Sequence, residues 1–403
     1  MVSTRQKLYQ ALDIQSKHYL TVIKYLNDAG GQVRLVGGVV RDTLLGLPVK
    51  DIDMVTDFMP AQVTSVLESH GVKIIPTGIN FGTVSAFINK EVFEITTLRK
   101  DLLCDGRRAS VEYSKDFRED AARRDFTINA LSYCPVKHEI YDYFSGIDDL
   151  NNRKVIFIGT ADERIKEDYL RILRFFRFSC KYANKIDDEA LEACVRFKAQ
   201  LKLLSGERIK SEMDNILSLE RSPYILETMY DSGIVQVIFP VTKYDQALHL
   251  KAIKVTQLFN THVDLTVIYA LLFDISLKEL LKLKFSRASA IRVIKLLQLK
   301  ESLGEKSLPL LLKTIWLEDK SFVSYFVFAS TLLEDNKIVY DLFVSLKNNS
   351  IPNFPLDGND LIKLGYVGEN LGKLINNLKH KWIESDFTLN KEQMINMVKN
   401  NEI

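Results

Sequence analysis

The stretch from Arg34 to Asp57 limits most strongly what this chain can fold into. Its order of residue types predicts a strand, a turn, a short helix, a loop and a second strand. The turn holds Gly37 and Gly38, which let the backbone approach a ligand closely. The helix has Arg41 near its start, runs for about two turns and ends at a Gly-Leu-Pro sequence. A small sheet with attached helices is therefore expected here.

Two aspartates, Asp51 and Asp53, follow in the extended segment DIDMV. Side chains alternate between the two faces of a strand, so both carboxylates lie on one face while Ile52 and Met54 point to the core. Carboxylates without His or Cys suit Mg²⁺, and the preceding turn at a helix N-terminus suits an anion. A metal site beside a phosphate site is the outline of nucleotidyl transfer. For the aspartate pair alone, two solvated carboxylates are the alternative.

A second motif is DAARRDFTINAL, from Asp120 to Leu131. Arg124 offers a forked donor to phosphate oxygens. Asp125 and Asn129 are four residues apart, so we expect them on one helical face, where a carboxylate and an amide can bind ribose hydroxyls.

From Asp162 onward the pattern becomes helical, in DERIKEDYLRILRFFRFSCKY. Asp168, Arg171, Arg174 and Arg177 recur every three residues, and apolar residues between them predict a buried face. A carboxylate accepts a hydrogen bond from the exocyclic amine of C or A, and a guanidinium donates to the adjacent ring acceptor. Taken alone, the pattern favours a plain amphipathic helix with a solvated basic face.

Together these motifs resemble the signature of class II CCA-adding enzymes and bacterial poly(A) polymerases, within the DNA polymerase beta-like nucleotidyltransferase superfamily. GGVVRDTLLGLPVKDIDMVTD carries the first part of the match, RRDFTINA is similar to the family's RRDxxxNA element, and EDYLR is similar to its EDxxR element, a protein template for CTP and ATP. The resemblance implies that Asp51 and Asp53 hold Mg²⁺ and are catalytic. It implies nucleotide binding by Gly37, Gly38, Arg41, Arg124, Asp125, Asn129, Asp168, Arg171, Arg174 and Arg177.

Two further elements are assigned by the same resemblance. Glu94 lies in VFEITTLR, a predicted strand beside Asp51 and Asp53, and would be the third catalytic carboxylate; a structural or orienting role stays open. The sequence DGRRA holds an Asp-Gly turn signal and resembles the flexible loop needed when the pocket switches to ATP. Its residues Asp105, Gly106, Arg107 and Arg108 would otherwise form a solvated basic loop.

The implied fold class is α+β: a polymerase beta-like head with a small mixed sheet and helices, then an all-α neck, body and tail. The expected boundaries are head 1–145, neck 146–220, body 221–350 and tail 351–403. In SGERIKSEM, from Ser205 to Met213, Glu207, Arg208 and Glu212 are expected to brace the template helix. Tail residues Leu371, Leu374, Ile375 and Leu378 are expected to form an apolar stripe.

The composition limits the kinds of partner and cellular environment that are expected. The net charge is only +2, so a nucleic acid must meet a local basic patch. Four cysteines show no metal or disulfide spacing. No apolar run approaches the roughly 20 residues of a membrane helix, and a soluble, cytoplasmic protein is expected.

The predicted activity is addition of C, C and A to the 3′ end of tRNA from CTP and ATP, with release of pyrophosphate. The tRNA would bind through its 3′ end and its acceptor and T-arm region, and no membrane or protein partner is implied. The alternatives are a bacterial poly(A) polymerase, a partial CC- or A-adding enzyme, and a noncatalytic RNA-binding relative.

Overall fold

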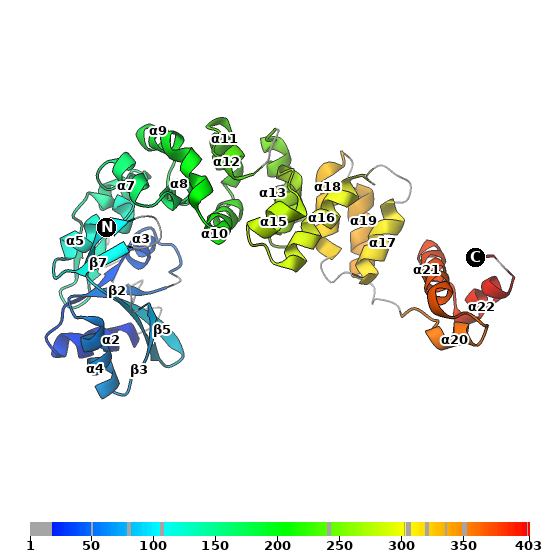
Figure 1. Ribbon diagram of the computed structural model, residues 1–403, viewed down its shortest axis with the longest axis horizontal. Coiled ribbons are helices and arrows are strands. Elements are labelled where there is room, and N and C mark those ends of the chain that lie inside the picture. The colour runs from blue at the N-terminus through cyan, green and yellow to red at the C-terminus, as the bar shows by residue number, and fades with distance from the viewer. Residues whose placement is uncertain are drawn as a thin grey trace. The chain divides into compact units, whose positions relative to one another are not determined.

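The structure is a computed structural model that describes residues 18–49, 51–78, 82–104, 109–239, 243–301, 303, 308–318, 322–334, 337–348, 353–400 and 402–403. The chain divides into two compact units, Met1–Ile238 and Phe239–Ile403. The first unit contains the sheet and the helices that follow it, and the regular elements in the described part of the second unit are helices joined by loops (Figure 1).

A mixed sheet forms the core of the first unit. In the described residues it has seven strands, in the order β3-β4-β5-β2-β1-β8-β9. They are β1 Val33–Val36, β2 Asp53–Thr56, β3 Lys73–Gly78, β4 Thr83–Ile88, β5 Glu91–Thr97, β8 Ser132–Cys134 and β9 Glu139–Tyr141. Only the β2–β5 pairing is parallel. This mixed sheet confirms the α+β prediction.

A separate hairpin leaves the sheet after β5. Its strands are β6 Arg99–Cys104 and β7 Ala109–Tyr113, which pair antiparallel. The predicted loop residues Asp105, Gly106, Arg107 and Arg108 fall between these strands and lie outside the described residues.

Helices α2 His18–Asp28, α3 Gly38–Leu44 and α4 Pro60–Ser69 accompany the sheet. Helix α4 begins at Pro60, whose fixed φ suits the first helical position. The remaining helices of this unit are α5 Phe117–Ala122, the 3₁₀ turn η2 Thr127–Asn129, α6 Gly146–Asn151, α7 Ala161–Glu167, α8 Leu170–Tyr182, α9 Asp188–Phe197, η3 Lys198–Leu203, α10 Gly206–Leu217, α11 Ser222–Asp231 and α12 Val235–Ile238.

The continuous helix predicted from Asp162 is wrong in one respect: it is broken between α7 and α8. Asp168 has extended backbone angles (φ −155°, ψ 108°), and its carboxylate accepts the backbone N–H of Leu170 at 3.0 Å. Aspartate often ends a helix this way because its side chain competes for backbone hydrogen bonds. Asp168 therefore stands at a junction, and only the arginines that follow lie on α8.

The second unit consists of α13 Gln246–Leu258, α14 Leu265–Leu272, α15 Leu277–Lys282, α16 Arg287–Glu301, α17 Leu308–Glu318, α18 Phe322–Leu332, α19 Lys337–Lys347, α20 Gly358–Ile362, α21 Gly368–Glu384 and α22 Lys391–Lys399. This agrees with the helical pattern predicted from the sequence. None of the described helices is long and apolar enough to cross a membrane.

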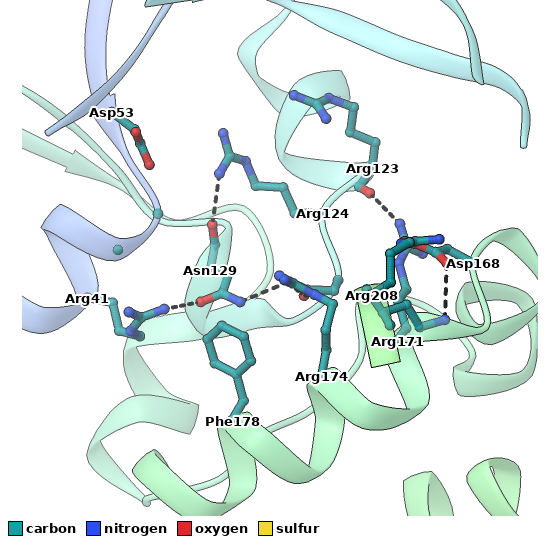
Figure 2. Close-up of a pocket in the computed structure, with 14 residues that line it drawn as sticks. Arg41, Asp53, Arg123, Arg124, Asn129, Asp168, Arg171, Arg174, Phe178 and Arg208 are labelled. Carbon is teal, nitrogen blue, oxygen red and sulfur yellow. Dashed lines mark hydrogen bonds and ion pairs between the residues drawn. The ribbon is translucent and has the colours of Figure 1, made fainter. Parts of the chain in front are cut away.

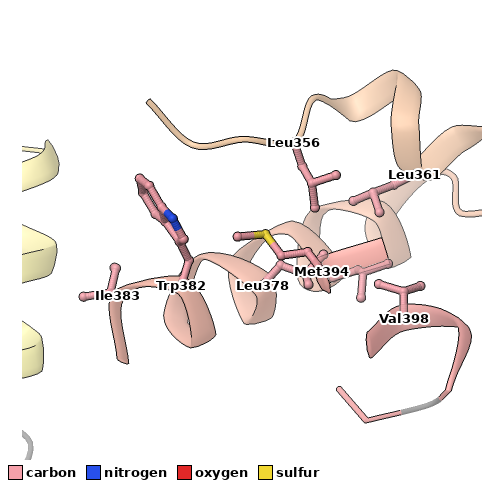
Figure 3. Close-up of a cluster of buried hydrophobic side chains, with 8 residues drawn as sticks. Leu356, Leu361, Leu378, Trp382, Ile383, Met394 and Val398 are labelled. Atoms are coloured by element: carbon pink, nitrogen blue, oxygen red, sulfur yellow. The ribbon is translucent and has the colours of Figure 1, made fainter. Parts of the chain in front are cut away.

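A small core holds the last three helices together (Figure 3). Leu378 and Trp382 of α21 are buried against Met394 of α22. The predicted stripe is confirmed, since Leu374 is also buried while Leu371 and Ile375 pack against the cluster. Its buried members are Leu356, Leu361, Leu374, Leu378, Trp382, Ile383, Met394 and Val398.

Truncation of Leu378 to Ala is expected to destabilise this core by about 2 to 5 kcal/mol, because it leaves a cavity among side chains that cannot all collapse into it. Hydrogen exchange of the α21 amides measures the change. Asn377→Ala on the same helix is exposed and serves as the control. Equal protection in the two variants would contradict the assignment of this cluster as the tail's core.

Candidate active site

Three carboxylates lie near one another where strand β2 begins beside β5, in the middle of the sheet. Asp53 opens β2, Glu94 is its register partner on β5, and Asp51 lies two residues before Asp53. Desolvation by the surrounding protein raises the pKa of Asp53, and the negative charges of Glu94 and Asp51 raise this pKa further. The positive charge of Arg124 lowers it. Within the described residues, no three acidic, His or Cys side chains already converge as a metal site. Negative charge is thus concentrated at this place, and a bound cation would reduce the repulsion between the carboxylates.

A pocket of about 500 Å³ opens beside Asp53 (Figure 2). It contains every predicted nucleotide-binding residue except Arg177; Asp51 and Glu94 do not line it. Asp53 and Arg41 lie toward one end, and Asp168 and Arg171 lie toward the other. The lining residues are Gly37, Gly38, Arg41, Asp53, Arg123, Arg124, Asp125, Asn129, Asp168, Leu170, Arg171, Arg174, Phe178 and Arg208.

The glycine turn shapes the wall next to Asp53. Gly37 has φ 68° and ψ −120°, a conformation that L-residues rarely adopt. A Cβ at Gly37 would lie 3.1 Å from Nη1 of Arg124. The backbone conformation therefore favours glycine, and a larger residue would also press against the end of the Arg124 side chain.

Asp125 and Asn129 do meet, but the predicted helical face is wrong. Phe126 is extended and Thr127–Asn129 forms a 3₁₀ turn, which folds the amide back onto the carboxylate. Asn129 Nδ2 donates to Asp125 at 2.8 Å, and Arg41 donates to the Asn129 side-chain oxygen.

Arg174 of α8 completes the surroundings of Asp125, with its Nε donating at 2.7 Å. Burial acts to raise the pKa of Asp125, but the charge of Arg174 and hydrogen bonds from Asn129, Arg174 and the Phe126 backbone lower it overall. Asp125 is therefore an ionised, buried anchor rather than an open acceptor.

The acid and the first arginine of the predicted template are both held by neighbours. Asp168 Oδ2 accepts from Arg208 at 2.6 Å. Arg171 donates to Glu167 at 2.5 Å and to the backbone carbonyls of Arg164 and Arg123 at 3.0 and 3.1 Å. These contacts fix both side chains at one end of the pocket.

Arg177 lies away from the pocket and donates to Glu212 at 2.6 Å. Glu212 is buried on α10, the helix that also carries Arg208. Glu212 therefore braces α8, as expected, whereas Arg208 contacts Asp168 at the junction before that helix. The part expected for Glu207 stays a prediction.

Four lining residues were missing from the predicted set: Arg123, Leu170, Phe178 and Arg208. Arg123 directly precedes Arg124 in the same motif, so its position beside a predicted phosphate-binding arginine could have indicated that it lines the pocket. Phe178 reads as an ordinary core position, although its ring lies 4.5 Å from the guanidinium carbon of Arg177 and 5.4 Å from that of Arg174. Arg208 belongs to a motif interpreted only as structural support.

Comparison with known proteins places this geometry in a family. Residues 33–156 match the model "Poly A polymerase head domain", and residues 185–245 match "Probable RNA and SrmB-binding site of polymerase A". The mitochondrial CCA tRNA nucleotidyltransferase 1 of Danio rerio is 34% identical over 90% of this chain and 86% of its own length. The chain belongs to the CCA tRNA nucleotidyltransferase family.

Other proteins named as CCA-adding enzymes are also similar to this chain. The CCA-adding enzyme of Staphylococcus aureus is 34% identical over 64% of this chain and 63% of its own length. The solved structure of the Bacillus stearothermophilus CCA-adding enzyme in complex with CTP has a TM-score of 0.77 at 21% identity, covering 96% of this chain and 98% of that one. The latter likeness shows a shared fold.

The lowered pKa of Asp125 predicts an acid-sensitive fold. Its stabilising contribution is complete above the ordinary carboxyl pKa of 3.8 and is lost as the pH falls through the lower folded value. Asp125→Asn should cost on the order of 3 kcal/mol at pH 7, since it leaves Arg174 without its buried partner. The variant should also lose less stability than wild type between pH 6 and pH 3.

Urea unfolding followed by circular dichroism measures both effects, because Trp316 and Trp382 lie in the other unit and their fluorescence does not report on this one. Asp188→Asn, in an exposed pair with Lys185, is the control and should not change the profile. An unchanged acid dependence in Asp125→Asn would contradict the role given to this carboxylate.

Proposed function

We propose that this protein adds C, C and A to the 3′ end of tRNA, using CTP and ATP and releasing pyrophosphate. The observation that carries the proposal is one pocket that joins Asp53 at one end to Asp168 and Arg171 at the other, in a chain of this family. Chemistry at the first end and base selection at the second are the two functions that such an enzyme requires.

Asp51 and Asp53 are proposed to hold Mg²⁺, with Glu94 as the third carboxylate of the site. The fit rests on the raised pKa of Asp53, which the charges of Glu94 and Asp51 help to cause. Oxygen ligands of this kind suit Mg²⁺, which shares its remaining positions with water and substrate phosphates. When bound, the ion would lower the pKa of the tRNA 3′-hydroxyl and neutralise charge on the reacting phosphate.

The arginines along the pocket are proposed to bind the triphosphate. Arg124 lies beside Gly37, close enough to influence the pKa of Asp53, and is only partly engaged by Asp120 at 3.2 Å. A guanidinium in that place can donate to phosphate oxygens with two parallel N–H groups. It would hold the leaving pyrophosphate near the metal carboxylates without any covalent intermediate.

Asp168 and Arg171 are proposed to read the base. Contacts in the described part of the chain use three of the five N–H donors of Arg171, and Asp168 retains acceptor capacity after binding Arg208 and the Leu170 amide. A carboxylate can accept a hydrogen bond from the exocyclic amine of C or A, whereas G and U have no amine at the corresponding ring position. Arg174 and Arg177 would shape this end through Asp125 and Glu212.

The finer organisation also remains a proposal: catalytic head 1–145, neck 146–220, body 221–350 and tail 351–403. The body and tail would bind the acceptor and T-arm region of the tRNA, with tail lysines such as Lys363 and Lys379 facing its phosphates. The loop of Asp105, Gly106, Arg107 and Arg108 would serve ATP addition. A cytoplasmic location stays a prediction, since the Danio rerio relative is named as mitochondrial.

The decisive experiment sizes the products formed on a tRNA transcript that lacks its last three nucleotides. With Mg²⁺ we expect two additions from CTP alone, three from CTP and ATP together, and none from GTP or UTP. A long ladder with ATP alone would identify a poly(A) polymerase instead. Two additions without a third would identify a CC-adding enzyme, and no addition at all would favour a noncatalytic RNA-binding protein.

Separate carboxylate variants test the metal site. Asp53→Asn should lower kcat on the order of a thousandfold, because it weakens stabilisation of charge that develops only during the reaction. Glu94→Gln should lower kcat less, because Glu94 lies next to Asp53 but does not line the pocket. Single-turnover addition of one C measures both.

Asp57→Asn supplies the matched control, since Asp57 follows β2 and its carboxylate accepts a hydrogen bond from the Gln32 amide at 2.7 Å. Full activity of Glu94→Gln would assign Glu94 an architectural role, and full activity of Asp53→Asn would refute the metal site.

A further inference from the structure

A closed ring of polar contacts begins and ends on helix α8. From its C-terminal end, Tyr182 donates to Asp42 at 2.8 Å, and Arg41 Nε donates to the same oxygen of Asp42 at 2.8 Å. Arg41 then reaches Asn129, whose amide donates to Asp125, and Asp125 binds Arg174 of α8. The members of this polar ring are thus Tyr182, Asp42, Arg41, Asn129, Asp125 and Arg174.

Within the ring, Arg41 is the pocket-lining cation nearest the glycine turn. It is 7% exposed, and its guanidinium carbon lies 4.3 Å from the centre of the Tyr182 ring. A long arginine side chain in solution samples many rotamers. Here Asp42, Asn129 and the aromatic face of Tyr182 hold it in one orientation.

Asp42 depends in turn on Tyr182. It is 8% exposed and lies on α3, whereas Tyr182 is 4% exposed at the end of α8. Burial acts to raise the pKa of Asp42, but its contacts with Arg41 and the hydrogen bond from Tyr182 lower it overall, so it stays ionised. Lys181 adds only a longer contact of 3.5 Å from a more exposed side chain. Lys181 and Tyr182 both belong to α8, and the Tyr182 hydroxyl makes the shorter and more deeply buried of these two contacts between α8 and Asp42.

We propose that Tyr182, which lies outside the pocket, is a positioning residue for nucleotide binding and acts by holding Asp42 so that Arg41 faces the nucleotide. This inference rests on the proposed function of the same pocket. Arg41 lies at the opposite end from Asp168 and Arg171 (Figure 2). Its effect therefore falls on the part of the ligand that CTP and ATP share, and not on the choice of base.

The test is calorimetric titration of CTP and of ATP into the full-length protein without tRNA. Tyr182→Phe keeps the ring and removes only the hydroxyl, so it should raise both Kd values about tenfold, the usual scale for one hydrogen bond to a charged group. The ratio of the two Kd values should not change. Tyr224→Phe, at an exposed tyrosine of the same unit, should bind like wild type.

A double variant separates positioning from mere stabilisation. Arg41→Lys removes the positioned guanidinium, so adding Tyr182→Phe to it should cause little further loss. Asp42→Asn also removes a charged partner of Arg41, so it should weaken the binding of CTP and of ATP by the same factor. Thermal unfolding by circular dichroism verifies that each variant is folded at the titration temperature.

Unchanged Kd values in Tyr182→Phe would overturn the proposal, as would losses that multiply in the double variant with Arg41→Lys. Because the titration contains no tRNA, it is independent of the product-sizing experiment. Wild-type protein that binds CTP but never extends tRNA would refute the proposed function while leaving the positioning role of Tyr182 to be decided by these Kd values.

Discussion

The ion pair between Asp125 and Arg174 joins the sheet-bearing part of the first unit to helix α8, and the pocket is built outward from it. Asp125 is buried and Arg174 is partly buried, so the carboxylate in particular would be costly without its partner. Asn129 and the Phe126 amide complete the hydrogen bonding of Asp125, and Arg41 extends the same ring toward Asp42 and Tyr182. A buried network is stable only when its members are satisfied, which makes this one an all-or-none scaffold.

This scaffold accounts for the arrangement of charge in the pocket. Many arginines line it, and several already touch a carboxylate or a backbone carbonyl of the protein: Arg41, Arg124, Arg171, Arg174 and Arg208. Such partners limit repulsion among the guanidiniums and fix their directions before any anion arrives. A polyanionic ligand then meets donors whose side-chain entropy is already lost, which favours binding.

The sequence was sufficient to predict the mixed sheet, the helical remainder and most of the pocket lining. Those features depend on local patterns such as the glycine turn before Asp51 and Asp53, or the apolar stripe through Leu374 and Leu378. Prediction failed where particular side-chain contacts decide the outcome. The turn that brings Asn129 onto Asp125 is held by their long-range contacts with Arg41 and Arg174. The helix break at Asp168 is local, because its carboxylate binds the Leu170 amide. The entry of Arg208 into the pocket likewise depends on packing between α8 and α10, which periodicity does not encode.

The parallel register of β2 and β5 has a consequence for how the charged site is maintained. Phe93 and Ile95 of β5 are buried on either side of exposed Glu94. Shifting that strand by one residue would expose both apolar side chains, at about 1.5 to 3 kcal/mol each, and bury the glutamate. Repulsion between two carboxylates 4 Å apart is about 1 kcal/mol in water and about 4 kcal/mol near a protein surface, which does not exceed the cost of exposing both apolar side chains. Burial of the apolar side chains therefore holds the carboxylates of Asp53 and Glu94 close together despite their repulsion. The folded sheet thus favours a bound cation beside these two residues.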